Sequence, residues 1–170
     1  MLDAKSIYFS CDLELGDIFG LTRINNFKIY EESFNKWDDK LVLGGMKVSK
    51  KERLIVVNSE ISSKMKNFII AHSIAHYFLH VKSGEEFETV EVIGDTTIGC
   101  SSSFESEANN LACELMITKE TLEREIINYK MLIAKSNLLN GLVVDNQIIK
   151  QISDKHLIPA SVLTYIMENN

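Results

Sequence analysis

Residues 71–80 read AHSIAHYFLH, so that His72 and His76 stand four positions apart. On a helix this spacing puts both imidazoles on one face, one turn from each other. Such a pair supplies two of the four positions around a tetrahedral zinc ion, and a stable site needs at least a third protein ligand. The alternative interpretation is a pair of partly buried histidines with satisfied hydrogen bonds. A metal site is therefore a hypothesis that depends on a third ligand elsewhere in the chain.

A second segment, FESEANNLACELMI, offers that third ligand. Helical spacing puts Glu105, Asn109 and Cys113 on one face, with alanines beside them that would allow close packing against the histidine helix. Glu105 could then complete the metal site, and Asn109 could hydrogen-bond a histidine. Glu107 lies about 200° from Glu105 around the helix, so only one of them can face the histidines. Glu107 stays open as the alternative ligand, and so does the possibility that both glutamates are solvated.

Ser73 follows the first histidine at the position where H-E-x-x-H zinc peptidases carry the glutamate that serves as general base. A neutral hydroxyl cannot accept a proton near pH 7 as a carboxylate does, and general acid–base catalysis is worth about 10²–10⁴-fold in rate. Efficient peptide hydrolysis is therefore not expected. Another carboxylate could take over the role if the fold brought it to the site; the candidates are Glu85, Glu86, Glu88 and Asp95.

The elements that must position these residues can be read from the hydrophobic pattern. A short helix is allowed within residues 1–20, and strand-like runs follow between residues 24 and 57, of which RLIVVN is the strongest. A helix capped by Ser62 or Ser63 carries the histidines and ends near Gly84. An irregular stretch follows, with one edge strand over Thr89–Ile93, and further helices are expected over 104–117, 121–137, 145–155 and 160–168. This order predicts an α+β domain with a small mixed sheet.

The composition limits the classes of function. With 170 residues, 45% hydrophobic and 25% charged, the chain suits a single soluble domain. Its net charge of −6 argues against direct nucleic-acid binding, and the last two helices carry too few basic side chains for a DNA-reading pair. Three cysteines without a C-x-x-C pair, together with a start that is unlike a signal peptide, predict a cytoplasmic protein. No run approaches the roughly 20 apolar residues of a membrane span.

Two motifs, in this order and spacing, give the chain a resemblance to the ImmA/IrrE family of zinc metallopeptidases. The strand end Ile55–Asn58, the helix motif around His72 and His76, and the ESEANNLACELM segment match the family's pattern, and the closing segment is similar to its usual ending. The resemblance spans roughly residues 40–168. It implies a zincin-like α+β domain, placed at residues 1–144, with a C-terminal helix pair at 145–170.

The resemblance also implies a set of roles. His72, His76 and Glu105 would be the ligands of a zinc ion, and Asn109 would support them. Family members act on helix-turn-helix (XRE-type) repressors, often in mobile genetic elements, and so influence transcription. Because Ser73 departs from the family pattern, the favoured interpretation is a degenerate, zinc-binding pseudoenzyme that binds such a repressor or another partner. The alternatives are an active zinc metallopeptidase that cleaves a repressor, and a metal-free interaction module.

Overall fold

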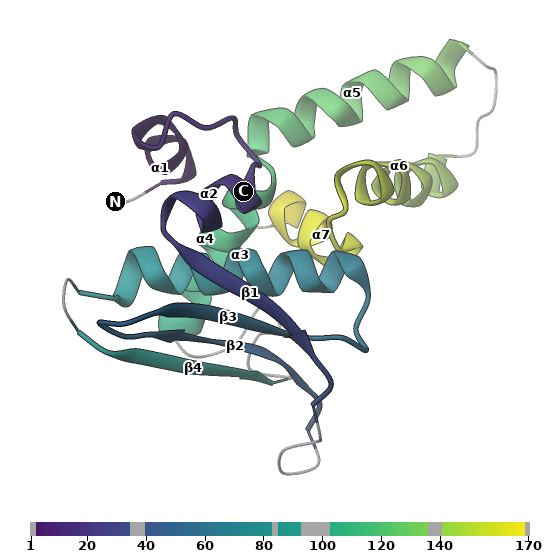
Figure 1. Ribbon diagram of the computed structural model, residues 1–170. Coiled ribbons are helices and arrows are strands. Elements are labelled where there is room, and N and C mark those ends of the chain that lie inside the picture. Colours follow the sequence, from purple (N-terminus) through teal and green to yellow (C-terminus); the bar gives the residue numbers. More distant parts are fainter. Residues whose placement is uncertain (1–2, 35–39, 83–84, 93–102, 136–140, 169–170) are drawn as a thin grey trace.

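A four-stranded mixed sheet and a long helix across one of its faces form the frame of the protein (Figure 1). The computed structural model describes residues 3–34, 40–82, 85–92, 103–135 and 141–168. The strands are β1 (Phe27–Glu32), β2 (Val42–Val48), β3 (Arg53–Asn58) and β4 (Phe87–Val92), and the long helix is α3 (Ser63–His80). All labelled helices lie on the same side of the sheet (Figure 1). The predicted α+β class is confirmed.

The strands lie in the order β1-β3-β2-β4. β1 is parallel to β3, whereas β2 is antiparallel to both β3 and β4. The β2–β3 hairpin closes through Ser49, whose hydroxyl accepts hydrogen bonds from the amides of Lys51 and Glu52, as the turn-rich sequence predicts. β4 is an edge strand, as predicted, and begins at Phe87, two residues earlier than expected.

Asn58 fixes the end of the sheet from which the chain turns toward α3. The side chain is fully buried; its Nδ2 donates to the Val42 carbonyl at 2.7 Å, and its Oδ1 accepts from the Glu60 amide at 2.9 Å. Four residues after Asn58, Ser62 caps α3 by accepting a hydrogen bond from the Met65 amide. The end of β3 and the start of α3 are thus held by polar side chains of the connecting segment.

α3 is buried all round in its middle half. Every residue from Phe68 to His76 is buried, because the sheet covers one side of the helix and other helices cover the opposite side. Gly44 on β2 permits the close approach of the sheet, since a Cβ there would lie 2.5 Å from the Val56 carbonyl oxygen and 2.9 Å from a methyl group of Ile69. The helix ends at His80 rather than near Gly84.

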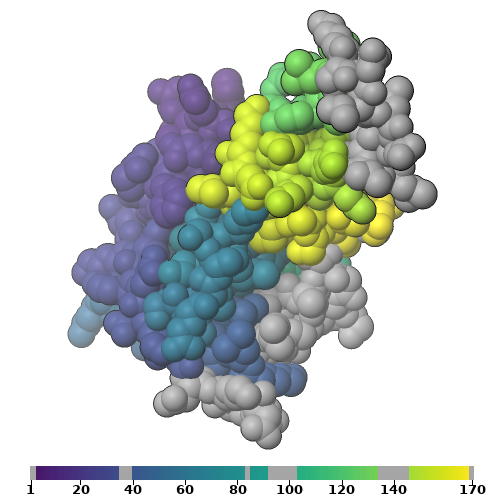
Figure 2. Space-filling model, turned by 90° about the vertical axis from the view of Figure 1, so that its right-hand side faces the viewer, coloured from purple at the N-terminus to yellow at the C-terminus, as the bar shows by residue number. Residues whose placement is uncertain are grey.

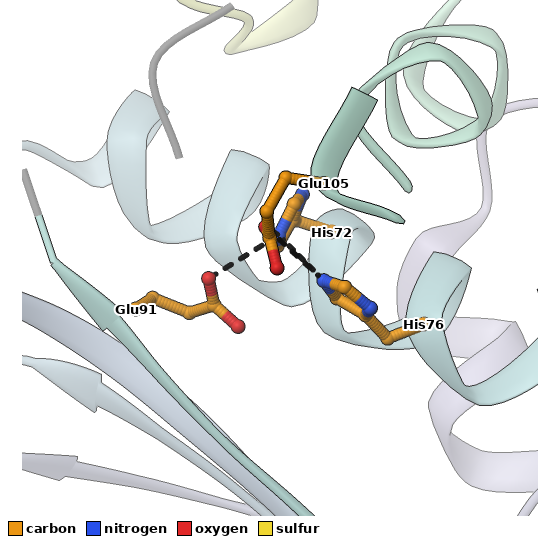
Figure 3. A group of neighbouring side chains, drawn as sticks. All are labelled: His72, His76, Glu91 and Glu105. Atoms are coloured by element: carbon orange, nitrogen blue, oxygen red, sulfur yellow. Dashed lines mark hydrogen bonds and ion pairs between the residues drawn. The ribbon is translucent and has the colours of Figure 1, made fainter. Parts of the chain in front are cut away.

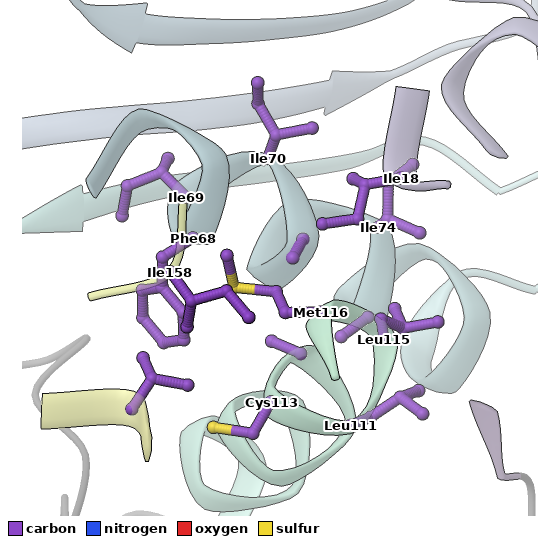
Figure 4. Packing of buried hydrophobic residues seen from close by; sticks show 14 of the residues in the cluster. Ile18, Phe68, Ile69, Ile70, Ile74, Leu111, Cys113, Leu115, Met116 and Ile158 are labelled. Atoms are coloured by element: carbon purple, nitrogen blue, oxygen red, sulfur yellow. The ribbon is translucent and has the colours of Figure 1, made fainter. Parts of the chain in front are cut away.

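The remaining helices surround α3. They are α1 (Ala4–Ser10), α2 (Ile18–Ile24), α4 (Ser103–Met116), α5 (Lys119–Lys135), α6 (Gly141–His156) and α7 (Ala160–Glu168). Two short helices therefore stand where a single one was expected in the N-terminal segment. The fully buried Ala108 and Ala112 let α4 pack closely on α3, as their size predicts. Figure 4 shows the resulting core, which contains Ile70, Ile74, Leu111, Leu115 and Met116.

The C-terminal helix pair contacts the first turns of α3. Lys64 forms an ion pair with Asp154, and the Asn67 amide donates to the Leu157 carbonyl at 3.3 Å. The yellow surface of the last helices accordingly adjoins the teal surface of α3 (Figure 2). The predicted packing role of the pair agrees with these contacts, while the proposed boundary between residues 144 and 145 stays a prediction. Among the described residues, none of the helices has the length and apolar character needed for a bilayer crossing.

Candidate metal centre

The two histidines of α3 point to one place. Both side chains are fully buried, and their Nε2 atoms lie 2.9 Å apart (Figure 3). At this separation one ring must present its lone pair while the other donates a proton, because two N–H groups would repel each other. The one-turn spacing has produced the convergence that the sequence predicts.

Glu105 reaches this point from the first turn of α4. One of its carboxylate oxygens lies 3.1 Å from the Nε2 of His72 and 3.4 Å from the Nε2 of His76. Glu107, the alternative left open by the sequence, is exposed on the other side of α4. The register of α4 thus brings Glu105, and not Glu107, to the histidines.

A fourth group, Glu91 of β4, joins the cluster. The residue is 2% exposed, and one carboxylate oxygen lies 3.2 Å from the Nε2 of His72 (Figure 3). The sequence-based reasoning missed Glu91 and considered other carboxylates of this region instead. Of those, Glu85, Glu86 and Glu88 are exposed, and Asp95 lies outside the described residues.

The alternation of β4 contains the signal that could have identified Glu91. Phe87, Thr89 and Glu91 are the less exposed residues of the strand, whereas Glu88 and Val90 between them are exposed. Successive side chains of a strand point to opposite faces, so Glu91 shares the face that carries the less exposed positions Phe87 and Thr89. A carboxylate at an inward position of a strand is uncommon without a partner and is a reason to look for one.

The charges of the cluster are strongly coupled. Burial by itself lowers the pKa of His72, but hydrogen bonds to Glu105 and Glu91 outweigh it and raise that pKa to about 9. Burial likewise raises the pKa of Glu105, and the bonds from His72 and His76 reverse this and lower it to about 2. Both shifts favour the charge-paired form of His72 and Glu105 over the neutral form.

Several buried polar atoms around the cluster have no hydrogen-bond partner in the described part of the chain. They are the Nδ1 atoms of His72 and His76, the second carboxylate oxygen of Glu91 and both amide atoms of Asn109. Asn109 is buried next to the site on α4, yet the expected hydrogen bond to a histidine is not formed in this structure. Its supporting role stays a prediction.

Ser73 offers no base at the position where the peptidase motif has one. The residue is fully buried, and its hydroxyl has no hydrogen-bond partner among the described residues. A hydroxyl in such an apolar setting is even less able to lose or accept a proton than one in water.

Aromatic rings close one side of the cluster. His80 stacks on Phe104 with ring centroids 3.8 Å apart, and Phe104 also contacts the ring of His76 at 4.9 Å. Burial, followed by the neighbouring His76, lowers the pKa of His80, which favours a neutral packing role over a charged one. Cys113 is buried farther along α4 and is not a member of the cluster, as its interpretation as a small apolar residue predicts.

The donor set fits a divalent metal ion. Ligand atoms of His72, His76, Glu91 and Glu105 all lie within 4.8 Å of one another. Imidazole nitrogens combined with carboxylate oxygens form a usual coordination sphere for zinc, and a buried carboxylate beside a partly buried one calls for a compensating cation. The residues present are therefore compatible with the metal that the sequence suggests.

Fold and site together define a zincin-like α+β domain. The family model for the IrrE N-terminal-like domain, peptidase family M78, matches residues 24–137, so the chain belongs to that family. "Uncharacterized immunity region protein 2" of Bacillus phage phi105 is similar to it, with 23% identity over 113 residues that cover 66% of this chain and 68% of the phage protein. The match confirms the resemblance seen in the sequence, although it begins earlier and ends before α6.

Proposed function

We propose that this protein is a zinc-binding, non-cleaving member of the IrrE N-terminal-like family that acts by binding a helix-turn-helix repressor. The observation that carries the proposal is the convergence of His72, His76 and Glu105 in a helix pair whose base position holds Ser73. The metal ligands are thus retained while the proton acceptor is missing.

The three residues would hold the ion from two helices. His72 and His76 supply nitrogen donors from α3, and Glu105 supplies oxygen from α4. When bound, zinc lowers the pKa of a coordinated water and polarises a substrate carbonyl. The rest of peptide hydrolysis needs a group that moves protons, and at Ser73 the chain lacks it. A loss of about 10²–10⁴-fold in rate follows from that one replacement.

The similar phage protein is the reason for proposing a repressor as the partner. The phage protein is named for an immunity region, which agrees with a role close to a transcriptional repressor. The chain's own charge of −6 disfavours a direct role on DNA. A protein partner that itself binds DNA therefore fits better than DNA, and sequestering it would relieve repression without cleavage.

The test uses a candidate helix-turn-helix repressor from the same genome. Purified zinc-loaded protein is incubated with the repressor, and binding is measured by calorimetry while cleavage is followed by mass spectrometry. We expect binding without cleavage. Cleavage that a chelator abolishes would establish the active peptidase instead, and binding that is unchanged in metal-free His72→Ala protein would establish the metal-free interaction module.

A further inference from the structure

Glu91 stands out because it is a buried carboxylate that the peptidase motif does not include. It lies on the edge strand β4, opposite Gly44 of β2, on the face of the sheet that α3 covers. Because Gly44 has no side chain, α3 lies close to the sheet, and the Glu91 carboxylate reaches the histidines. We propose that Glu91 is a fourth protein ligand that closes the metal site; the inference rests on the metal binding proposed above.

The distances agree with a four-ligand arrangement. Zinc bound by nitrogen and oxygen at about 2.0–2.1 Å sets neighbouring ligand atoms of a tetrahedron roughly 3.3–3.4 Å apart. Glu91 lies 3.2 Å from His72, close to the 3.1 Å and 3.4 Å that separate Glu105 from the two histidines. The histidine nitrogens are 2.9 Å apart. Glu91 is therefore as near to His72 as Glu105 is, and the ligand atoms of all four residues lie within 4.8 Å of one another.

The charge balance also favours coordination by Glu91. Two neutral imidazoles and two carboxylates carry a total charge of −2, which a divalent cation neutralises. With only one carboxylate the loaded site keeps a positive charge, which attracts hydroxide, as in catalytic zinc centres. The 2% exposed Glu91 also has one carboxylate oxygen without a hydrogen-bond partner in the described residues, and a buried charge in that state is costly unless a cation compensates it.

A closed site has a different use from an open one. Structural zinc sites have four protein ligands, whereas catalytic sites leave a position for water or substrate. With Glu91 bound, the ion would join α3, the edge strand β4 and α4, three elements that follow one another in the sequence. The bound ion then holds the edge strand in place. Hydrolysis is prevented for two reasons: Glu91 occupies the coordination position that water would need, and Ser73 cannot act as the base.

Cobalt(II) substitution tests this arrangement without an activity assay. The full-length protein is loaded with cobalt, and its visible absorption is recorded before and after addition of azide, which binds only where a coordination position is open. We expect the intense spectrum of four-coordinate cobalt in the wild type and no response to azide. In Glu91→Gln the spectrum should respond to azide, and zinc affinity measured against a competing chelator should fall by about tenfold or more.

The controls separate this inference from the proposed function. Glu88→Gln, on the exposed face of the same strand, should keep the wild-type spectrum and affinity. His72→Ala should bind neither metal. A wild-type spectrum that shifts with azide overturns the role of Glu91 while leaving metal binding intact, and so does an unchanged affinity in Glu91→Gln. A wild type that binds no cobalt or zinc overturns the proposed function and this inference together.

Discussion

Removal of zinc should lower the Tm of the protein. The size of the change follows from the free zinc concentration relative to the Kd and from the length of the chain. The ligands come from α3, α4 and, with Glu91, from β4, so the complete site exists only in the folded state. A ligand that binds only the folded state stabilises it by about 2.7 kcal/mol at a free concentration 100 times the Kd. The unfolding entropy is about 2.1 cal/mol/K per residue. For 170 residues, a stabilisation of about 2.7 kcal/mol therefore corresponds to a rise in Tm of about 8 °C.

The assay is differential scanning calorimetry over a series of free zinc concentrations set with a metal buffer. Tm should rise steadily with zinc, by about 11 °C at 1,000 times the Kd, where the stabilisation reaches about 4.1 kcal/mol. His72→Ala and Glu105→Gln should show no such rise. A Tm that is independent of zinc in the wild type, or an equal rise in both variants, would refute the reasoning.

Three further predictions concern the frame around the site. Asn58→Ala should lower the free energy of unfolding by about 2–4 kcal/mol in urea titrations, because the Val42 carbonyl and a loop amide lose buried partners; an effect below about 0.5 kcal/mol would contradict this. Gly44→Ala should cost about 1–3 kcal/mol in the same titration, because its Cβ would collide with a backbone carbonyl of β3; a neutral result would show that the sheet can shift. Burial raises the pKa of the Cys113 thiol to about 12, so at pH 8 it should react with iodoacetamide far more slowly than the half-buried Cys11 in peptide-resolved mass spectrometry; equal rates would contradict its burial.

The local elements were predictable because their signals are local. RLIVVN gave β3 through its β-branched run, and Ser62 marked the start of α3 as an N-cap. The positions of His72 and His76 followed from helical periodicity alone. In the N-terminal segment, polar and apolar residues mix without a clear period, and the break into α1 and α2 was missed.

The candidate site was predictable only as far as its residues lie on one element. The phase of α4 toward α3 decides between Glu105 and Glu107, and that phase depends on how Ala108 and Ala112 pack rather than on the glutamates themselves. Glu91 was missed for a similar reason. The alternation of β4 marks Glu91 as an inward position, but the approach of Glu91 to His72 also depends on the pairing of β4 with β2, a long-range contact.

The central claim is that this protein holds a metal ion at the histidine pair of α3. Metal analysis by mass spectrometry of protein purified without chelators, alongside His72→Ala purified in the same way, tests that claim most directly. The account predicts about one zinc per wild-type chain, as expected for a single site of this donor set, and close to none in the variant. A wild type without zinc, or a variant that holds as much as the wild type, would contradict it.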